Sequence, residues 1–273
     1  MTARRQFIQA AALAACAPLH VLAGPAPKSR LSIGIAGYSF AHYRNDRDRA
    51  IALLKDLGVD AVTLKDFHLP MDASAEQARS IVKSFKEAGI RVYGLGVIYM
   101  KDDAEAERAF RYAGRAGVDM IIGSPAPTVL PEVERLVKET GIRIAIHNHG
   151  PEDAHYPDID TIHRHIAGLD ARIGICLDVG HSFRCGHRPD RMLQRFGSRV
   201  IDMHIKDVTV QQPDGASVIP GRGVLPLRDV FHVAQSIGFG GFCSLEYEVP
   251  GDPAVGIAES IGYLRGLLKG LAD

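Results

Sequence analysis

The sequence predicts an α/β protein that folds as a (β/α)8 barrel in a single domain. Apolar, strand-like runs alternate with helical patterns eight times, and a glycine often ends the helical pattern just before the next strand. Alternation of this kind implies a parallel sheet, and eight units imply a closed barrel rather than an open sheet. No linker-like composition divides the body, so we expect one barrel over residues 31–273.

The expected strands are short apolar runs rich in β-branched residues, and several of them end in histidine, lysine or a carboxylate. Parallel strands bring their carboxyl ends to one face of a barrel, where enzymes of this architecture carry their catalytic groups. In chain order the runs cover residues 31–40, 61–67, 91–99, 120–125, 143–149, 173–181, 200–207 and 242–248.

Helical patterns occupy the intervals between these strands. Over residues 74–89, Ile81 and Phe85 recur at helical spacing while charged residues lie on the other face. Similar patterns, the last of them the eighth helix, cover residues 47–58, 225–238 and 256–270. A left-handed backbone suits glycine at a helix end. We expect it at Gly58, Gly89, Gly117, Gly141 and Gly238.

The first 24 residues have the pattern of an export signal: a basic start, an Ala/Leu-rich middle and a small-residue end. The pair Arg4-Arg5 resembles a twin-arginine signal, which carries folded proteins across a membrane. We therefore expect cleavage after Ala23 and a periplasmic or secreted protein. An alternative interpretation makes Cys16 a lipid-anchored N-terminus, because the residues before it resemble a lipobox.

Composition limits the partners of the full 273-residue chain. Its 32 basic and 32 acidic residues balance, which disfavours nucleic acid as a partner. No apolar run is long enough for a transmembrane segment. Cys176, Cys185 and Cys243 match no zinc motif, and the first and last lie in apolar strand runs where we expect small core residues. A small carbohydrate is the expected partner, and a homo-oligomer is compatible with the sequence.

Ionisable residues gather at the ends of the expected strands, where apolar residues would be the default. Burying such groups unpaired is costly, and a divalent cation removes that cost by taking carboxylates and neutral imidazoles as ligands. Any one of these residues alone is explained by a hydrogen bond or an ion pair. Their recurrence on separate strands predicts a metal site. The residues are Lys65, His68, His147, His149, Asp178, His181, His204, Lys206, Glu246 and Glu248.

Four segments in order resemble the xylose isomerase-like TIM barrels, a group of sugar phosphate isomerases and epimerases. They are ICLDVGH (175–181), DMHIKD (202–207), PGRGVLPL (220–227) and SLEYE (244–248). The resemblance covers residues 31 to 270 and implies a Mn²⁺-like ion at the top of the barrel, with Zn²⁺, Co²⁺ or Mg²⁺ as alternatives. It implies the ligands His147, Asp178, His204 and Glu246.

The resemblance also suggests roles for the remaining residues. Glu246, His147, Lys65 and His181 are the expected catalytic groups. His149, Lys206, Arg222 and His68 are the expected substrate contacts. For Lys206 and Arg222, a salt bridge to Glu248 or Asp207 is an equally good explanation.

His147 departs from the family pattern, which usually has glutamate at this position of strand five. In the family's sugar epimerases, two glutamates flank the substrate carbon as acid and base. With one carboxylate fewer, three functions stay open. The first is a metal-dependent isomerase or epimerase that abstracts a proton next to the carbonyl of a non-phosphorylated sugar or polyol. The second is a lyase or hydrolase of 3-keto-glycosides, and the third is a non-catalytic sugar- or metal-binding barrel.

Overall fold

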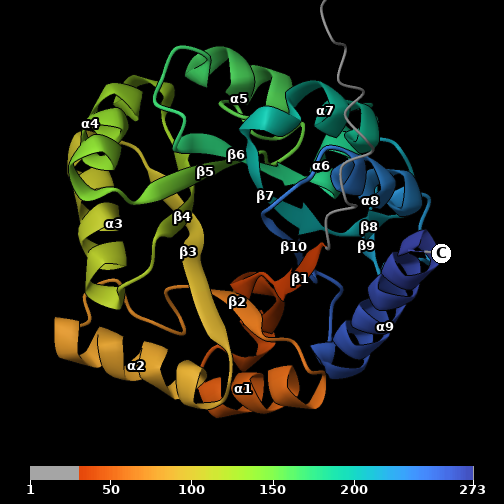
Figure 1. Ribbon diagram of the computed structural model, residues 1–273, viewed down its shortest axis with the longest axis horizontal. Coiled ribbons are helices and arrows are strands. Elements are labelled where there is room, and N and C mark those ends of the chain that lie inside the picture. The colour runs from red at the N-terminus through yellow and green to blue at the C-terminus, as the bar shows by residue number, and fades with distance from the viewer. Residues whose placement is uncertain (1–30, 273) are drawn as a thin grey trace, which may run out of the picture.

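The computed structural model describes residues 31–272, which form a closed barrel of eight parallel strands ringed by helices (Figure 1). Around the barrel the order is β1-β10-β7-β6-β5-β4-β3-β2, so each strand pairs with its sequence neighbour in the barrel and the last closes on the first. The (β/α)8 fold expected from the sequence is confirmed as a single barrel.

All eight predicted strands are present, most of them shorter than their apolar runs. The last residues of several runs leave the sheet and form loops at its carboxyl end; after β1 the chain turns into the 3-10 helix η1 (Gly37–Tyr43). The barrel strands are β1 (Ser32–Ile35), β2 (Ala61–Leu64), β3 (Arg91–Met100), β4 (Met120–Pro125), β5 (Arg143–His147), β6 (Ile173–Asp178), β7 (Val200–Ile205) and β10 (Phe242–Leu245).

The helices lie around the barrel (Figure 1), and the four helical ranges predicted from the sequence correspond to the first two and the last two of them. The helices are α1 (Arg47–Asp56), α2 (Ala75–Glu87), α3 (Asp103–Ala116), α4 (Leu130–Thr140), α5 (Ile159–Ile166), α6 (Val179–Arg184), α7 (Pro189–Phe196), α8 (Leu227–Ser236) and α9 (Pro253–Ala272). Two further 3-10 turns are η2 (Pro127–Val129) and η3 (Gly197–Arg199). The five glycines expected to be left-handed all have φ between 59° and 79°. That conformation turns the chain from a helix into the next strand.

The apolar residues form two layers. The larger lies between the strands and the helices and includes Phe85 and Phe110, both almost fully buried. The smaller fills the inside of the barrel and includes Tyr93, Ile122 and Cys176. Filling of the interior by side chains makes the barrel a packed core with its open face at the strand ends.

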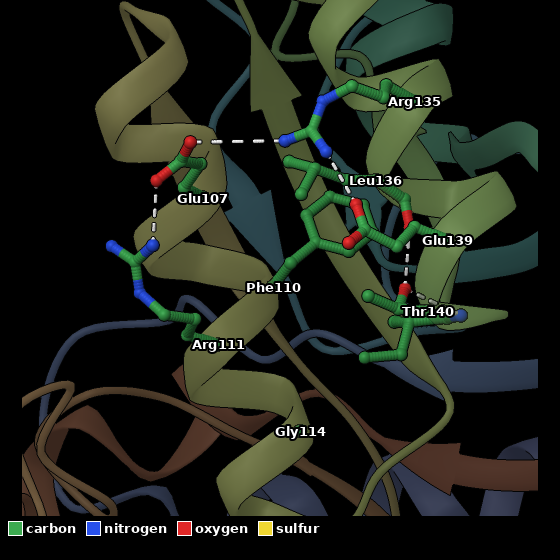
Figure 2. Close-up of a pocket in the computed structure, with 9 residues that line it drawn as sticks. Glu107, Phe110, Arg111, Gly114, Arg135, Leu136, Glu139 and Thr140 are labelled. Atoms are coloured by element: carbon green, nitrogen blue, oxygen red, sulfur yellow. Dashed lines mark hydrogen bonds and ion pairs between the residues drawn. The ribbon is translucent and has the colours of Figure 1, made fainter.

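A groove on the outside of the barrel runs between α3 and α4 (Figure 2). Glu107 on α3 pairs with Arg111 at 2.7 Å and faces Arg135 on α4 at 3.9 Å, and Arg135 also pairs with Glu139 at 2.5 Å. Phe110 closes the bottom of the groove. This groove belongs to the helical layer, and it contains none of the predicted site residues.

The predicted export signal over residues 1–24, including Arg4-Arg5 and Cys16, lies outside the described residues. Within residues 31–272, no helix combines the length and hydropathy needed to cross a membrane.

A small antiparallel pair that the sequence did not predict, β8 (Asp207–Val208) and β9 (Ser217–Val218), follows β7 at the barrel mouth. The buried Asp207 carboxylate accepts backbone N–H groups of Gly221 at 2.9 Å, Gly223 at 3.1 Å and Leu225 at 3.0 Å. A side chain on Gly223 would collide with Asp207. The glycine-rich segment 220–227 is thereby wrapped around one carboxylate.

We expect Asp207→Ala to lower the free energy of unfolding by about 2–4 kcal/mol, because it leaves backbone donors of the loop without an acceptor. Asp207→Asn keeps one acceptor oxygen and should cost less. The exposed Asp214 on the same loop system is the matched control, with an expected effect of Asp214→Ala within about 0.5 kcal/mol. Urea unfolding measures all three, and equal stabilities of the two alanine variants would contradict this role of Asp207.

Candidate metal centre and active site

Four side chains from four strand ends converge at the carboxyl face of the barrel. His147 ends β5, Asp178 ends β6, His204 lies near the end of β7 and Glu246 follows β10. One ligand atom from each lies within 4.8 Å of those of the others. His147 Nε2 is 3.0 Å from His204 Nδ1 and 3.4 Å from Asp178 Oδ2, and His204 Nδ1 is 3.1 Å from Glu246 Oε2. The structure thus brings together the four residues expected to hold the metal.

The sheet register explains this convergence. Asp178 on β6 lies directly beside His204 on β7, and His147 on β5 lies beside Cys176 on β6. Alternate residues of a strand share a face, so Asp178 and Cys176 both point inward. The ligand-type residues therefore occupy the top inward-facing positions of neighbouring strands.

The donor set fits a divalent metal. All four residues are at most 5% exposed, and two imidazoles with two carboxylates are ligands that Zn²⁺, Mn²⁺ and related ions accept. Asp178 Oδ1 accepts the backbone N–H of His181 at 2.7 Å. Its Oδ2 faces the cluster, where Lys206 Nζ lies 3.0 Å away and His147 Nε2 lies 3.4 Å away. Buried carboxylates need positive charge beside them, and a divalent cation at this point would add to the charge that Lys206 supplies.

Electrostatics separate the protonation states of the cluster. Burial alone would lower the pKa of His147, but Asp178 and Glu246 outweigh it and raise that pKa to about 9. Burial opposes ionisation of Glu246 as well, but His204 and Lys206 hold its pKa well below the usual range. Without a metal, an imidazolium therefore balances part of the charge of the carboxylates.

Lys206 lies at the edge of the cluster and is 2% exposed. Its Nζ is 3.0 Å from Asp178 Oδ2, 2.9 Å from Glu246 Oε2 and 2.8 Å from Glu248 Oε2. Burial disfavours its charge, but these three carboxylates raise the pKa of Lys206 well above the usual value. The salt bridge to Glu248 considered from the sequence is present, and Lys206 also contacts two of the expected metal ligands.

His181 lies on α6 between two cationic side chains. Its Nε2 is 3.3 Å from Lys206 Nζ and its Nδ1 is 3.2 Å from an Arg184 nitrogen. Burial is the main reason that the pKa of His181 falls to about 3. Arg184 also binds Glu152 and the carbonyl of Pro213, which join two loops at the rim. His181 is therefore a neutral imidazole fixed beside the cluster.

His149 lies at the barrel mouth with a polar neighbour beside each of its ring nitrogens. Its Nδ1 is 3.2 Å from Asp153 Oδ2, and its Nε2 is 3.0 Å from the Tyr99 hydroxyl. The rings of Tyr99 and His149 stack with centroids 5.2 Å apart. Burial lowers the pKa of His149. Because a neutral imidazole that donates from Nδ1 to a carboxylate has its lone pair on Nε2, the basic nitrogen faces Tyr99.

The two expected groups from the second strand have different side-chain surroundings, although the Lys65 backbone N–H donates to His68 Nδ1 at 3.4 Å. Lys65 Nζ donates to the Val97 carbonyl at 2.8 Å, and burial lowers its pKa. His68 is 4% exposed and packs against Phe40 and Phe67, with ring centroids 6.1 and 4.5 Å away. Burial lowers the pKa of His68 to about 4. Lys65 lines the loop side of the mouth, whereas His68 is surrounded by aromatic rings.

Arg222, an expected substrate contact, forms a bidentate pair with Glu259 on α9 at 2.6 and 2.7 Å. Its side chain is 63% exposed. The partner is therefore neither Glu248 nor Asp207, the two carboxylates considered from the sequence. The structure does not bring Arg222 to the ligand cluster.

Two buried residues near the cluster were not singled out from the sequence. Asn148 accepts the Asp178 backbone N–H at 2.9 Å and donates to its carbonyl at 3.2 Å, which ties the ends of β5 and β6 together. Asp202 is fully buried, and its Oδ2 is 3.9 Å from His204 Nε2. The spacing Asp-x-His-x-Lys at 202–206 could have revealed Asp202, because residues two apart share a strand face.

Comparison with known proteins agrees with the barrel fold. The family model described as "Xylose isomerase-like TIM barrel" matches residues 51–267. An inosose dehydratase of Lacticaseibacillus casei is 28% identical over 142 residues, which are 45% of this chain and 46% of that relative. The chain thus matches about half the length of this curated relative.

Two solved structures share the fold. The IOLI protein, which contains a bound zinc atom, has a TM-score of 0.74 at 16% identity and covers 88% of this chain and 99% of its own. A 3-keto-D-glucoside 4-epimerase from E. coli, YcjR, has a TM-score of 0.69 at 15% identity and covers 86% of this chain and 99% of its own. At these identities the similarity establishes the fold alone.

We expect Asp178→Ala to weaken Mn²⁺ binding by about 100-fold or more, because it removes one of the two carboxylate ligands of the cluster. Arg222→Ala should leave Mn²⁺ affinity unchanged, because Arg222 pairs with Glu259 on the surface. Isothermal titration calorimetry on the metal-free proteins measures both. Stoichiometric Mn²⁺ in the Asp178→Ala protein would remove Asp178 from the site.

Metal affinity should fall as the pH is lowered. Below its pKa of about 9 in the metal-free protein, His147 carries a proton that a metal must displace. Displacing one proton makes the apparent association constant rise by about tenfold per pH unit up to that value. Mn²⁺ titrations at three pH values between neutral and mildly alkaline measure this slope. An affinity independent of pH would show that His147 is not protonated before the metal binds.

Proposed function

The chain belongs to the xylose isomerase-like TIM barrel family, and we propose that it is a metal-dependent enzyme that removes the proton next to the carbonyl of a non-phosphorylated keto-sugar or keto-polyol. Its four-ligand cluster and the neutral histidines around it support this. A divalent ion held by His147, Asp178, His204 and Glu246 would polarise the substrate oxygens.

The pair of His149 and Asp153 carries the proposal. A general base needs a lone pair, a pKa compatible with the neutral form and a third group that fixes its orientation. His149 has all three: Asp153 Oδ2 lies 3.2 Å from Nδ1, burial favours the neutral ring, and the Nε2 lone pair faces the Tyr99 hydroxyl at 3.0 Å, a contact that a bound substrate would replace. Glu246, the base expected from the sequence, has its pKa held low by His204 and Lys206, which favours a role as ligand.

The residues around the cluster are suited to stabilise the enediolate that proton removal forms. Lys206 is a fixed cation beside Asp178 and Glu246. His181, kept neutral, has one ring nitrogen beside Lys206 and the other beside Arg184, so it helps to hold the Lys206 ammonium in place. Lys65, just after β2, adds a further cationic group on the opposite side of the barrel. The two lysines act on oxygen atoms, and neither needs to accept the carbon-bound proton.

β-Elimination of water is the outcome that this arrangement favours. Epimerisation moves a proton from one face of a carbon to the other, and therefore benefits from two acid–base groups on opposite sides. At the strand-five position the chain carries His147, whose Nε2 points into the ligand cluster. Elimination needs one base and a proton donor for the leaving hydroxyl. The similarity to an inosose dehydratase supports the same choice.

Isomerisation or epimerisation is the second candidate, supported by the fold shared with the 3-keto-D-glucoside 4-epimerase. Both reactions start with the same proton removal and differ in whether the enediolate is reprotonated or loses a substituent. A substrate with a leaving group next to the acidic carbon therefore separates them.

Solvent exchange tests the shared first step. In D₂O with Mn²⁺, the wild-type protein should introduce deuterium at the carbon next to the carbonyl of a keto-polyol, as followed by NMR. His149→Gln should slow this exchange by about 100-fold or more while it keeps the metal, because only the base is lost. Glu246→Gln should lose metal and exchange together. Full exchange by the metal-loaded His149→Gln protein would exclude His149 as the base.

The products then decide between the two outcomes. Loss of water from inosose-type ketones, with no epimer formed, supports elimination. Epimerised product from the wild-type protein, increased by the variant His147→Glu, would support the second candidate instead. A protein shown to hold Mn²⁺ could also neither exchange deuterium nor turn over any of the ketones tested. That result would leave a non-catalytic barrel as the remaining hypothesis.

A further inference from the structure

Beneath the four-ligand cluster lies a second group of metal-ligating atoms that includes sulfur. Cys176 on β6 and one ring nitrogen each of His147 and His204 have ligand atoms within 4.8 Å of one another. All three residues are at most 2% exposed. Cys176 lies beside His147 in the register of β5 and β6, one inward-facing position below Asp178. The group shares both imidazoles with the upper cluster and replaces its two carboxylates with a thiol.

The surroundings of Cys176 leave its sulfur available. Its one described hydrogen bond is the thiol donating to Asp202 Oδ2 at 3.7 Å, so the sulfur lone pairs have no donor directed at them among the described residues. His147 Nδ1 and His204 Nε2 have no hydrogen-bond partner within residues 31–272. Cys243, also fully buried, is in the outer apolar layer and has no such neighbours. Cys176 is therefore set apart by its place under the cluster.

Ligand softness gives the two groups different preferences. Carboxylates suit Mg²⁺ and Mn²⁺, whereas thiolate with imidazole suits Zn²⁺ and other thiophilic ions. We propose that Cys176, with His147 and His204, forms a second binding position for a thiophilic divalent metal, below the position that Asp178 and Glu246 complete. Binding there forms a metal–sulfur bond and releases to solvent the thiol proton and the proton that His147 carries in the metal-free protein.

The two positions exclude each other because they share His147 and His204. Cys176 lies one inward-facing position below Asp178 on β6, so an ion bound through its sulfur lies deeper in the barrel than an ion held by Asp178 and Glu246. A substrate that enters from the mouth then meets the carboxylates and not the metal. The inference builds on the metal centre of the proposed function, and it predicts that a thiophilic ion displaces the hard ion that the reaction uses.

Thiolate-to-metal charge transfer in the near ultraviolet tests the proposal without any assay of activity. The metal-free wild-type protein with one equivalent of Cd²⁺ or Co²⁺ should show the band, and Cys176→Ser should lack it. Cys243→Ser, a matched change of another buried cysteine, should keep the band. We also expect Cys176→Ser to weaken Zn²⁺ binding by about tenfold or more and to leave Mn²⁺ binding within about threefold of wild type.

The reciprocal variant separates the two groups. Asp178→Asn should lose Mn²⁺ binding and still give the Cd²⁺ band, because it removes a ligand of the upper group only. Thermal unfolding of each variant, with Cys176→Ala as the second substitution, shows that a missing band is not a folding failure. No band in the wild-type protein, or a band that persists in folded Cys176→Ser, would overturn the inference. Deuterium exchange with Mn²⁺ would survive that result, so the two proposals fail separately.

Discussion

Two carboxylates held inside the barrel, away from water, determine most of the chemistry of this protein. Asp178 and Glu246 are 0% and 5% exposed, and Glu248 adds a third acidic group nearby. Like charges this close in a medium of low dielectric constant cannot persist without compensation. Lys206 supplies one fixed positive charge. The negative charge of Asp178 and Glu246 also raises the pKa of His147 to about 9 in spite of its burial. A divalent ion bound at this point would compensate the same negative charge.

The scaffold around these carboxylates is arranged to hold them still. Asn148 binds both backbone groups of Asp178, and the Asp178 side chain caps α6 through the His181 N–H. Asp207, next to Lys206, gathers the glycine-rich loop. Each contact fixes a strand end or a loop at the barrel mouth. The position of the ligand oxygens therefore depends on hydrogen bonds that lie outside the ligand set.

The barrel could be predicted from the sequence, because the features that determine this fold are local. Apolar runs, helical periodicity and glycines such as Gly117 and Gly141 are readable one segment at a time, and the structure has all of them. The convergence of the ligands was also predictable, since parallel strands bring their ends together. Strand ends were harder to place, because residues 36–40 turn into η1 although their composition continues that of β1.

Contacts between residues that are far apart in the chain could not be predicted from the sequence. Arg222 pairs with Glu259 of the last helix at the protein surface. No local sequence pattern predicts a contact between residues that are 37 positions apart. The aromatic surroundings of His68 depend on how η1 folds over the loop after β2. Cys176 has the composition of an ordinary strand residue, and only the register shows that it lies beside Asp202 and beneath the imidazoles. Pairwise packing decides these roles.

The histidine at strand five connects these observations. A glutamate there would add a further negative charge to a cluster that already contains Asp178 and Glu246, and it would serve as a second base at the metal. His147 instead contributes a nitrogen whose charge depends on whether a metal is present. The site then has no second carboxylate base at strand five, and the basic nitrogen with the best orientation is His149, held by Asp153 outside the ligand set. Separating the ligand from the base frees the imidazole pair to accept either carboxylate oxygens or the Cys176 sulfur as co-ligands. Histidine in place of glutamate at position 147 thus affects both the choice between elimination and epimerisation and the range of metals that the barrel can hold.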